Sequence, residues 1–177
     1  MMDEKKKEIK SYNIDKITDK IYLGDIEGAY EIDYLKQEGI THLLSLLEEE
    51  FCPKYEDDYP IIRKIVEVDD GDSENIFQFF KECIEFIENA TKIYIHCMAG
   101  VSRSPTIVIS YLMWKEKKGY NETYFFVKNK RRFIGPNQGF VSQLKLFEEK
   151  LKENNYNLDK IDFKNINIDE LLKKNEN

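Results

Sequence analysis

Two residues suited to phosphoryl transfer stand close together in the segment HCMAGVSRS, residues 96–104. Cys97 carries a thiol, whose thiolate form is a strong nucleophile. Arg103, six positions later, carries a planar guanidinium that matches two oxygens of a phosphate group and stays charged at physiological pH. Together they indicate a site where sulfur attacks phosphorus while the arginine binds the phosphate oxygens. The spacing alone is weak evidence, and the sequence around it is much stronger evidence.

The residues around this pair predict a turn from a strand into a helix. Alternating apolar residues at 92–97 predict the strand, and Pro105 suits the first turn of a helix that we expect to begin at about Ser104. The amides and the dipole at a helix N-terminus attract anions and favour the thiolate of Cys97. We therefore expect no metal and no cofactor. The predicted phosphate-binding loop consists of Met98, Ala99, Gly100, Val101, Ser102 and Arg103.

The leaving oxygen of a phosphate ester needs a proton, and the acidic turn VDDGDSE at 68–74 offers candidate donors. This turn follows a predicted strand and precedes a predicted helix. Asp69, Asp70 and Asp72 all fit the role, and each also suits a helix cap or a solvated turn. The residues by themselves leave this choice open.

Strands and helices alternate along the chain. This order predicts an α/β fold with a central, mostly parallel, twisted sheet of about five strands and helices on both faces. Ligands bind such sheets at the carboxyl ends of the strands, which is where the loop lies. Strands are predicted at 20–24, 41–46, 60–68 and 92–97, and helices at 28–39, 74–90, 104–118, 121–133 and 137–152.

Length, charge and cysteine content limit the number of domains, the partners and the location that the sequence predicts. The 177 residues suit one domain, which we divide into a lead-in at 1–12, a catalytic domain at 13–153 and an Asn/Lys-rich tail at 154–177 that is expected to be mobile. The net charge of −7 argues against nucleic acid and anionic membranes as partners. No signal peptide or membrane span is predicted. Three cysteines fit a reducing compartment, so we expect a cytoplasmic location, with the nucleus as a second compartment.

Three other features have an ordinary interpretation beside a functional one. Cys83 lies on the apolar stripe of the helix predicted at 74–90 and is expected in the core. Cys52 is a candidate for a reversible disulfide with an oxidised Cys97. The basic cluster KNKRR at 128–132 is typical of a solvated helix face, and the alternative is that it steers phosphorylated substrates toward the site.

The segment HCMAGVSRS resembles the signature of the cysteine-dependent protein phosphatases, and its Ala-Gly-Val-Ser-Arg-Ser run resembles that of the dual specificity phosphatases. Four more segments are similar to family segments in the same order: ITDKIYLGDIEGA, GITHLLSL, ISYLMW and GPNQGFVSQLKLFE. The resemblance covers about residues 13–150. It implies a small, atypical, single-domain member with a phosphatase-type fold.

The resemblance also assigns roles within the site. In the family, the general acid lies five residues before the Asn-apolar start of the helix, and counting back from Asn75 gives Asp70. Asp69 is the main alternative. Ser104 is expected to donate a hydrogen bond to the sulfur of Cys97 and to assist breakdown of a phosphocysteine.

Two further residues are expected to support the loop. His96 resembles a family histidine that orients the loop and tunes the cysteine, although a lone histidine is more often structural. Asn137 resembles a family asparagine that braces the phosphate loop, and a helix N-cap is the ordinary interpretation.

By this resemblance the chain is a hydrolase that removes phosphate from phosphotyrosine and from phosphoserine or phosphothreonine in proteins. Its partners would be phosphorylated proteins, with protein kinases among them, and its oligomeric state stays open. One alternative is a phosphatase of a non-protein phosphoester, such as an inositol lipid, an RNA end or a glycan. Another is a phosphate-binding pseudoenzyme, which the presence of both Cys97 and Arg103 disfavours. The neutral Met98, Ala99 and Val101 depart from relatives that act on lipids or RNA.

Overall fold

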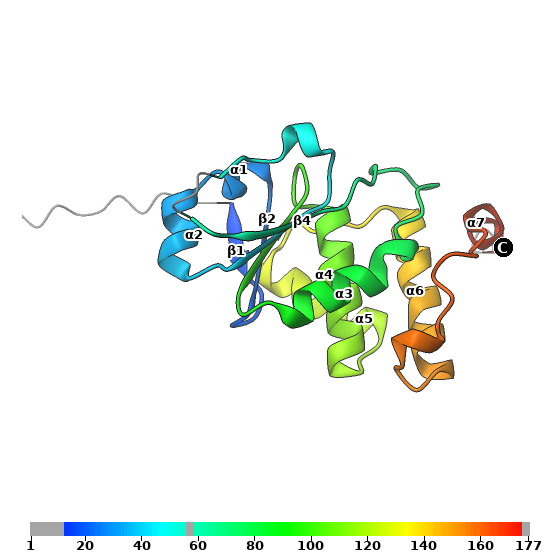
Figure 1. The fold of residues 1–177 in the computed structure, drawn as a ribbon. Coiled ribbons are helices and arrows are strands. Elements are labelled where there is room, and N and C mark those ends of the chain that lie inside the picture. The colour runs from blue at the N-terminus through cyan, green and yellow to red at the C-terminus, as the bar shows by residue number, and fades with distance from the viewer. Residues whose placement is uncertain (1–12, 56–58, 175–177) are drawn as a thin grey trace, which may run out of the picture.

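A five-stranded sheet runs through the middle of the fold (Figure 1). The computed structural model describes residues 13–55 and 59–174, so the predicted lead-in at 1–12 lies outside the described residues. The strand order is β1-β2-β5-β3-β4; β1 is antiparallel to β2, and all other neighbours are parallel. The mostly parallel sheet is therefore confirmed. The strands are β1 (Ile14–Lys16), β2 (Ile21–Gly24), β3 (His42–Ser45), β4 (Ile62–Ile65) and β5 (Ile93–His96).

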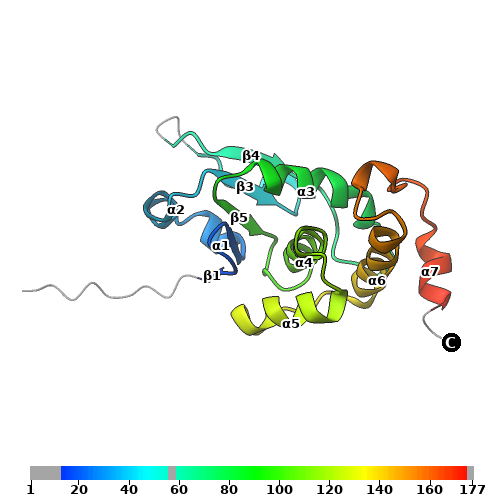
Figure 2. The same cartoon turned by 90° about the horizontal axis from the view of Figure 1, so that it is seen from below.

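Helices cover both faces of this sheet. Figure 2 shows α1 and α2 on one side and α3, α4, α5 and α6 on the other. The helices are α1 (Ile26–Ala29), α2 (Ile32–Glu38), α3 (Phe80–Asn89), α4 (Arg103–Glu116), α5 (Tyr120–Lys130), α6 (Gln138–Glu153) and α7 (Ile168–Lys174). Among the residues that the structure describes, no helix has both the length and the apolar character needed to cross a bilayer.

Two predicted helices differ from the observed ones. The helix expected at 28–39 is two short helices, which are separated at Tyr30 and at Glu31, whose backbone is not helical. The first begins early, because Asp25 caps it by accepting a hydrogen bond from the amide of Gly28. Gly39 ends α2 in the left-handed region, as its position predicts. The helix expected at 74–90 opens with a 3-10 turn at Phe77–Phe79 and becomes α-helical only at α3.

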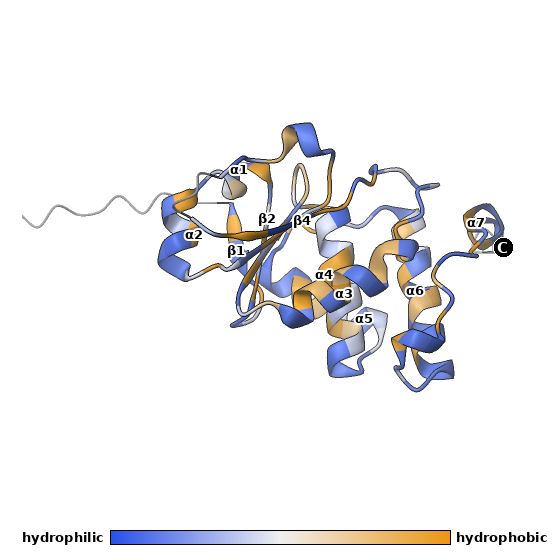
Figure 3. Ribbon diagram, viewed as in Figure 1, coloured by the Kyte–Doolittle hydropathy of each residue, from blue (hydrophilic) through white to orange (hydrophobic). Residues whose placement is uncertain are grey.

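The core has two parts, one on each face of the sheet. The smaller part joins Tyr22, Leu43 and Tyr94 to α1 and α2. The larger part lies between the opposite face and the remaining helices, and it includes Cys83, as predicted. Helix α4 stands in the middle of this layer (Figures 2 and 3). Its residues from Ser104 to Met113 are all buried. The first ten residues after Arg103 in this helix are therefore packed against other parts of the protein all around the helix axis.

The segment after residue 153 differs from the mobile tail expected there. Leu158, Ile161 and Phe163 are buried in the larger core. The Phe163 ring lies 5.3 Å from that of Phe77, centroid to centroid. Burial of these few apolar side chains in the main core stabilises the segment, although most of the residues around them are polar. A short helix, α7, also lies within this segment.

Candidate active site

Strand β5 places Cys97 at the carboxyl edge of the sheet. The strand lies between β2 and β3 and is buried along its whole length, so its end is fixed from both sides. Cys97 follows directly and is 2% exposed. The hydroxyl of Ser104, in the first turn of α4, donates a hydrogen bond to the Cys97 sulfur at 3.2 Å. This contact is the one that the resemblance predicts for Ser104.

Donors outside the loop bind the carbonyl groups of its residues 98–102 and that of Cys97 before it. Six successive carbonyls, from Cys97 to Ser102, have a donor within hydrogen-bonding distance. A trans peptide directs its C=O and its N–H to opposite sides, so the amides point to the concave side of the loop. Such a ring of amides at a helix N-terminus attracts an anion. The donors, in loop order, are His96 Nδ1, Ile26 N, Arg131 Nη2, Arg131 Nε, Gly135 N and the amide and hydroxyl of Thr106.

Gly100 is required at the tightest point of this loop. Its φ of +65° is a conformation that side chains rarely adopt. A Cβ atom there would also lie 2.3 Å from the carbonyl oxygen of Gly24. The loop can therefore approach β2 only with glycine at this position.

Arg103, the first residue of α4, closes the loop. Its Nη1 donates to the carbonyl oxygen of Val68 at 3.1 Å. Its Nε is buried and has no hydrogen-bond partner in the described part of the chain. A buried, unpaired donor is costly, and an oxyanion in the loop would satisfy it.

His96 supports the loop from within the sheet. Its ring is buried, and burial lowers the pKa of this histidine to about 4, so the imidazole is neutral at pH 7. Its Nδ1 lies 3.3 Å from the carbonyl oxygen of Cys97, which can only accept, so Nδ1 carries the proton. Its Nε2 then accepts from the hydroxyl of Ser45 at 2.8 Å.

Asp70 accepts two hydrogen bonds, one from the loop and one from the start of α6. The Ser102 hydroxyl donates to Asp70 Oδ1 at 2.6 Å, and Asn137 Nδ2 donates to the same oxygen at 2.9 Å. Asn137 also caps α6, because its side-chain oxygen accepts from the amide of Phe140 at 2.8 Å. The ordinary interpretation of Asn137 as a helix N-cap is therefore present in the structure. Its side-chain amide contacts Asp70, and it is the backbone N–H of Asn137 that reaches Ser102 of the loop, at 3.1 Å. Asp69, on the same turn, is exposed, as Asp70 is.

The remaining predicted residues occupy the rim and the surroundings of the loop. Met98 and Ala99 are exposed at its outer edge, and Val101 is partly buried. Cys52 is buried, and burial raises the pKa of its thiol, so it is a weaker nucleophile than a free cysteine. Its disulfide with Cys97 stays a prediction.

The sequence interpretation missed Arg131. The cluster at 128–132 was expected on a solvated face, and Lys130 and Arg132 are indeed exposed, whereas Arg131 is buried against the loop. Composition favoured the solvated face because four of the five residues are basic. The signal that separates Arg131 from its neighbours is its place at the C-terminal end of α5, where the chain turns back toward the loop.

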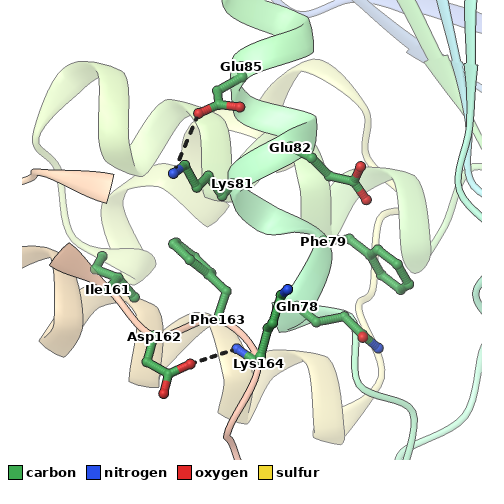
Figure 4. A pocket seen from close by; sticks show the side chains of 9 residues that line it. All are labelled: Gln78, Phe79, Lys81, Glu82, Glu85, Ile161, Asp162, Phe163 and Lys164. Carbon is green, nitrogen blue, oxygen red and sulfur yellow. Dashed lines mark hydrogen bonds and ion pairs between the residues drawn. The ribbon is translucent and has the colours of Figure 1, made fainter. Parts of the chain in front are cut away.

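A separate pocket lies away from this site. It has a volume of about 560 Å³ and lies between α3 and the segment at 161–164 (Figure 4). None of the residues that line it belongs to the loop. Its walls carry both charges, and Lys81 on α3 forms an ion pair with Glu85 there.

Comparisons with known proteins identify the family of this chain. The sequence model of the dual specificity phosphatase catalytic domain matches residues 21–150. The chain therefore belongs to the dual specificity phosphatase family, a family of protein phosphatases. The crystal structure of DUSP15 has 30% sequence identity and a TM-score of 0.72, and the match covers 86% of this chain and 99% of that one.

Two curated relatives show how much of a longer protein the match covers. Dual specificity protein phosphatase 1B of Arabidopsis thaliana is 34% identical over 146 residues, which are 80% of this chain and 86% of the relative. MAP kinase phosphatase with leucine-rich repeats protein 1 of Dictyostelium discoideum is 40% identical over 142 residues, which are 78% of this chain and 16% of that protein. The shared part is the phosphatase domain.

Proposed function

We propose that the chain hydrolyses phosphotyrosine and phosphoserine or phosphothreonine in proteins, through a phosphocysteine intermediate and without a metal. The observation that carries the proposal is the buried Arg103 Nε, which has no hydrogen-bond partner among the described residues, at the end of a loop whose carbonyl groups from Met98 to Ser102 are bound from outside. Such a loop suits an oxyanion. Cys97, at its start, would place sulfur behind the phosphorus atom.

In the first step, the thiolate of Cys97 attacks phosphorus. A sulfur–phosphorus bond forms, and the bond from phosphorus to the substrate oxygen breaks. The loop amides and Arg103 stabilise the charge on the three remaining phosphate oxygens. Asp70 gives its proton to the substrate oxygen, which leaves as a phenol or an alcohol.

In the second step, the Asp70 carboxylate takes a proton from a water molecule. The water oxygen bonds to phosphorus while the sulfur–phosphorus bond breaks. Inorganic phosphate leaves, and Cys97 returns as a thiolate. The 3.2 Å hydrogen bond from Ser104 supports the sulfur as it departs with its electron pair.

Phosphorylated proteins are the proposed substrates, and protein kinases in signalling are proposed among them. Family membership supports this class. The neutral side chains of Met98, Ala99 and Val101 add no charge for a polyanionic lipid or RNA end. The acidic composition and the few cysteines support the cytoplasm as the location, with the nucleus as a second compartment.

The test is direct detection of the intermediate. The purified chain is mixed with an aryl phosphate, quenched in acid within milliseconds and analysed by peptide mass spectrometry. We expect one phosphoryl group on Cys97, turnover that EDTA does not change, and no turnover by Cys97→Ser. Cys52→Ser, assayed with reductant, is the control for general thiol loss. Turnover by Cys97→Ser at the wild-type rate would rule out the covalent mechanism.

A substrate panel separates the alternatives. Phosphotyrosine and phosphothreonine peptides, a phosphoinositide, a 5′-phosphorylated RNA and a phosphorylated glycan are compared by kcat/KM at equal enzyme. Protein phosphatase function predicts that the peptides are preferred. A preference for another substrate would replace the proposed class, and phosphate binding without turnover of any of them would indicate a pseudoenzyme.

A further inference from the structure

Arg131 is a charged residue in an unusual position. It follows the last residue of α5 and is 1% exposed. Burying a guanidinium is costly unless it is paired and hydrogen-bonded. The hydrogen bonds and the ion pair of this side chain must therefore offset the cost of burying its charge.

The guanidinium connects two segments that are far apart in the sequence. Nε donates to the carbonyl oxygen of Gly100 at 2.9 Å, and Nη2 lies 3.4 Å from that of Ala99. Nη1 donates to Asp15 Oδ2 at 2.7 Å and to Asn13 Oδ1 at 3.0 Å. One side chain thus links the candidate phosphate loop to the start of β1 and orients two consecutive peptide groups.

We propose that Arg131 is a positioning residue for the phosphate site, an inference that rests on the proposed function of the loop. By holding the carbonyls of Ala99 and Gly100 outward, it keeps the amides of Gly100 and Val101 directed at the bound phosphate. Asp15 holds the guanidinium in place and balances its charge. Arg131 itself does not touch the phosphate.

A purely structural role predicts a different result from a positioning role. Loss of a structural contact lowers the unfolding temperature and the fraction of folded protein, but each folded molecule keeps its affinity for phosphate. Loss of a positioning contact weakens phosphate binding and slows the chemical step in protein that is fully folded, because the amides no longer point at the oxyanion.

The experiment compares Arg131→Met with Arg132→Met. The second variant removes an exposed charge one position away and measures the effect of charge alone. Inhibition by inorganic phosphate is measured against an aryl phosphate, together with kcat, KM and thermal unfolding. For Arg131→Met we expect phosphate binding at least about ten-fold weaker than for Arg132→Met, and a lower kcat per folded molecule. Arg131→Lys keeps the positive charge without the planar guanidinium. Phosphate affinity and kcat that lie between those of Arg131→Met and the wild type would support the proposal.

Asp15→Asn covers the case in which Arg131→Met does not fold. It leaves the buried volume unchanged and removes only the charged partner of Arg131, so we expect a smaller loss of phosphate affinity, about three-fold or more. Folded variants with the same phosphate affinity and kcat as Arg132→Met would overturn the positioning role and leave the proposed function intact. A wild-type chain that neither binds phosphate nor turns over an aryl phosphate would overturn both.

Discussion

The hydroxyl of Ser102 donates a 2.6 Å hydrogen bond to Oδ1 of Asp70, which joins the candidate acid to the candidate phosphate loop. Asn137 donates to the same oxygen. Both hydrogen bonds go to Oδ1, so Oδ2 is the oxygen that the proposed proton transfer would use. This arrangement makes the position of the acid depend on the loop.

Ser102→Ala removes one of the two hydrogen bonds that hold Asp70. We expect kcat/KM for a phosphotyrosine peptide to fall about ten-fold, because the acid is less well placed. An aryl phosphate with an acidic leaving phenol needs little protonation, so its loss should be much smaller. Ser73→Ala, an exposed serine beyond the same turn, is the matched control. Equal losses on both substrates would show that Ser102 acts on the loop and not through Asp70.

Replacing the acid tests the choice between adjacent aspartates. Asp70→Asn should lower kcat on phosphotyrosine peptides by roughly 10², the usual contribution of a general acid. Asp69→Asn makes the same chemical change at the exposed neighbour and should have little effect. Steady-state kinetics on one peptide compares the two variants. The reverse result would assign the acid to Asp69.

Ser104→Ala should slow the second step more than the first. Without its hydrogen bond, the Cys97 sulfur is a poorer leaving group, so phosphocysteine hydrolysis should slow about ten-fold while the first release of phenol remains fast. Stopped-flow measurement should then show a burst. Ser110→Ala is the control, because Ser110 is buried in the same helix and donates to the backbone of Ile107. A uniform slowing without a burst would contradict this role.

The buried His96 predicts how stability depends on pH. Its pKa is lowered from 6.5 to about 4 in the folded state, so as the pH falls below 6.5 the unfolded chain takes up the proton first. The contribution of the neutral ring to the free energy of unfolding is complete above pH 6.5 and is lost as the pH falls toward 4. This loss is about 3 kcal/mol at most.

The free energy of unfolding in urea is measured for the wild type and for His96→Gln, each at pH 7.5 and pH 5. Both chains carry the same carboxylates, so the difference between them isolates the contribution of His96. The stability advantage of the wild type should shrink by about 2 kcal/mol between these values. An advantage that does not change with pH would show that the histidine titrates normally in the folded state.

Much of the fold was predictable because its signals are local. Apolar alternation identified the four parallel strands, and the helical repeat identified the helices that cover them. Strand β1 was not predicted, because three residues carry too short a pattern and only Ile14 faces the core. The burial of Phe163 was missed for a related reason, since an isolated aromatic in a polar segment does not reveal the core that it reaches.

By itself, the sequence determined which reactive groups stand together in the candidate site. Cys97, Gly100 and Arg103 lie within one short turn, where spacing and backbone conformation are governed by neighbouring residues. Only the tertiary structure decided which distant groups hold that turn in shape. Arg131 reaches Asp15 across 116 positions, and burial of a charge is a property of the packed chain that no local pattern contains.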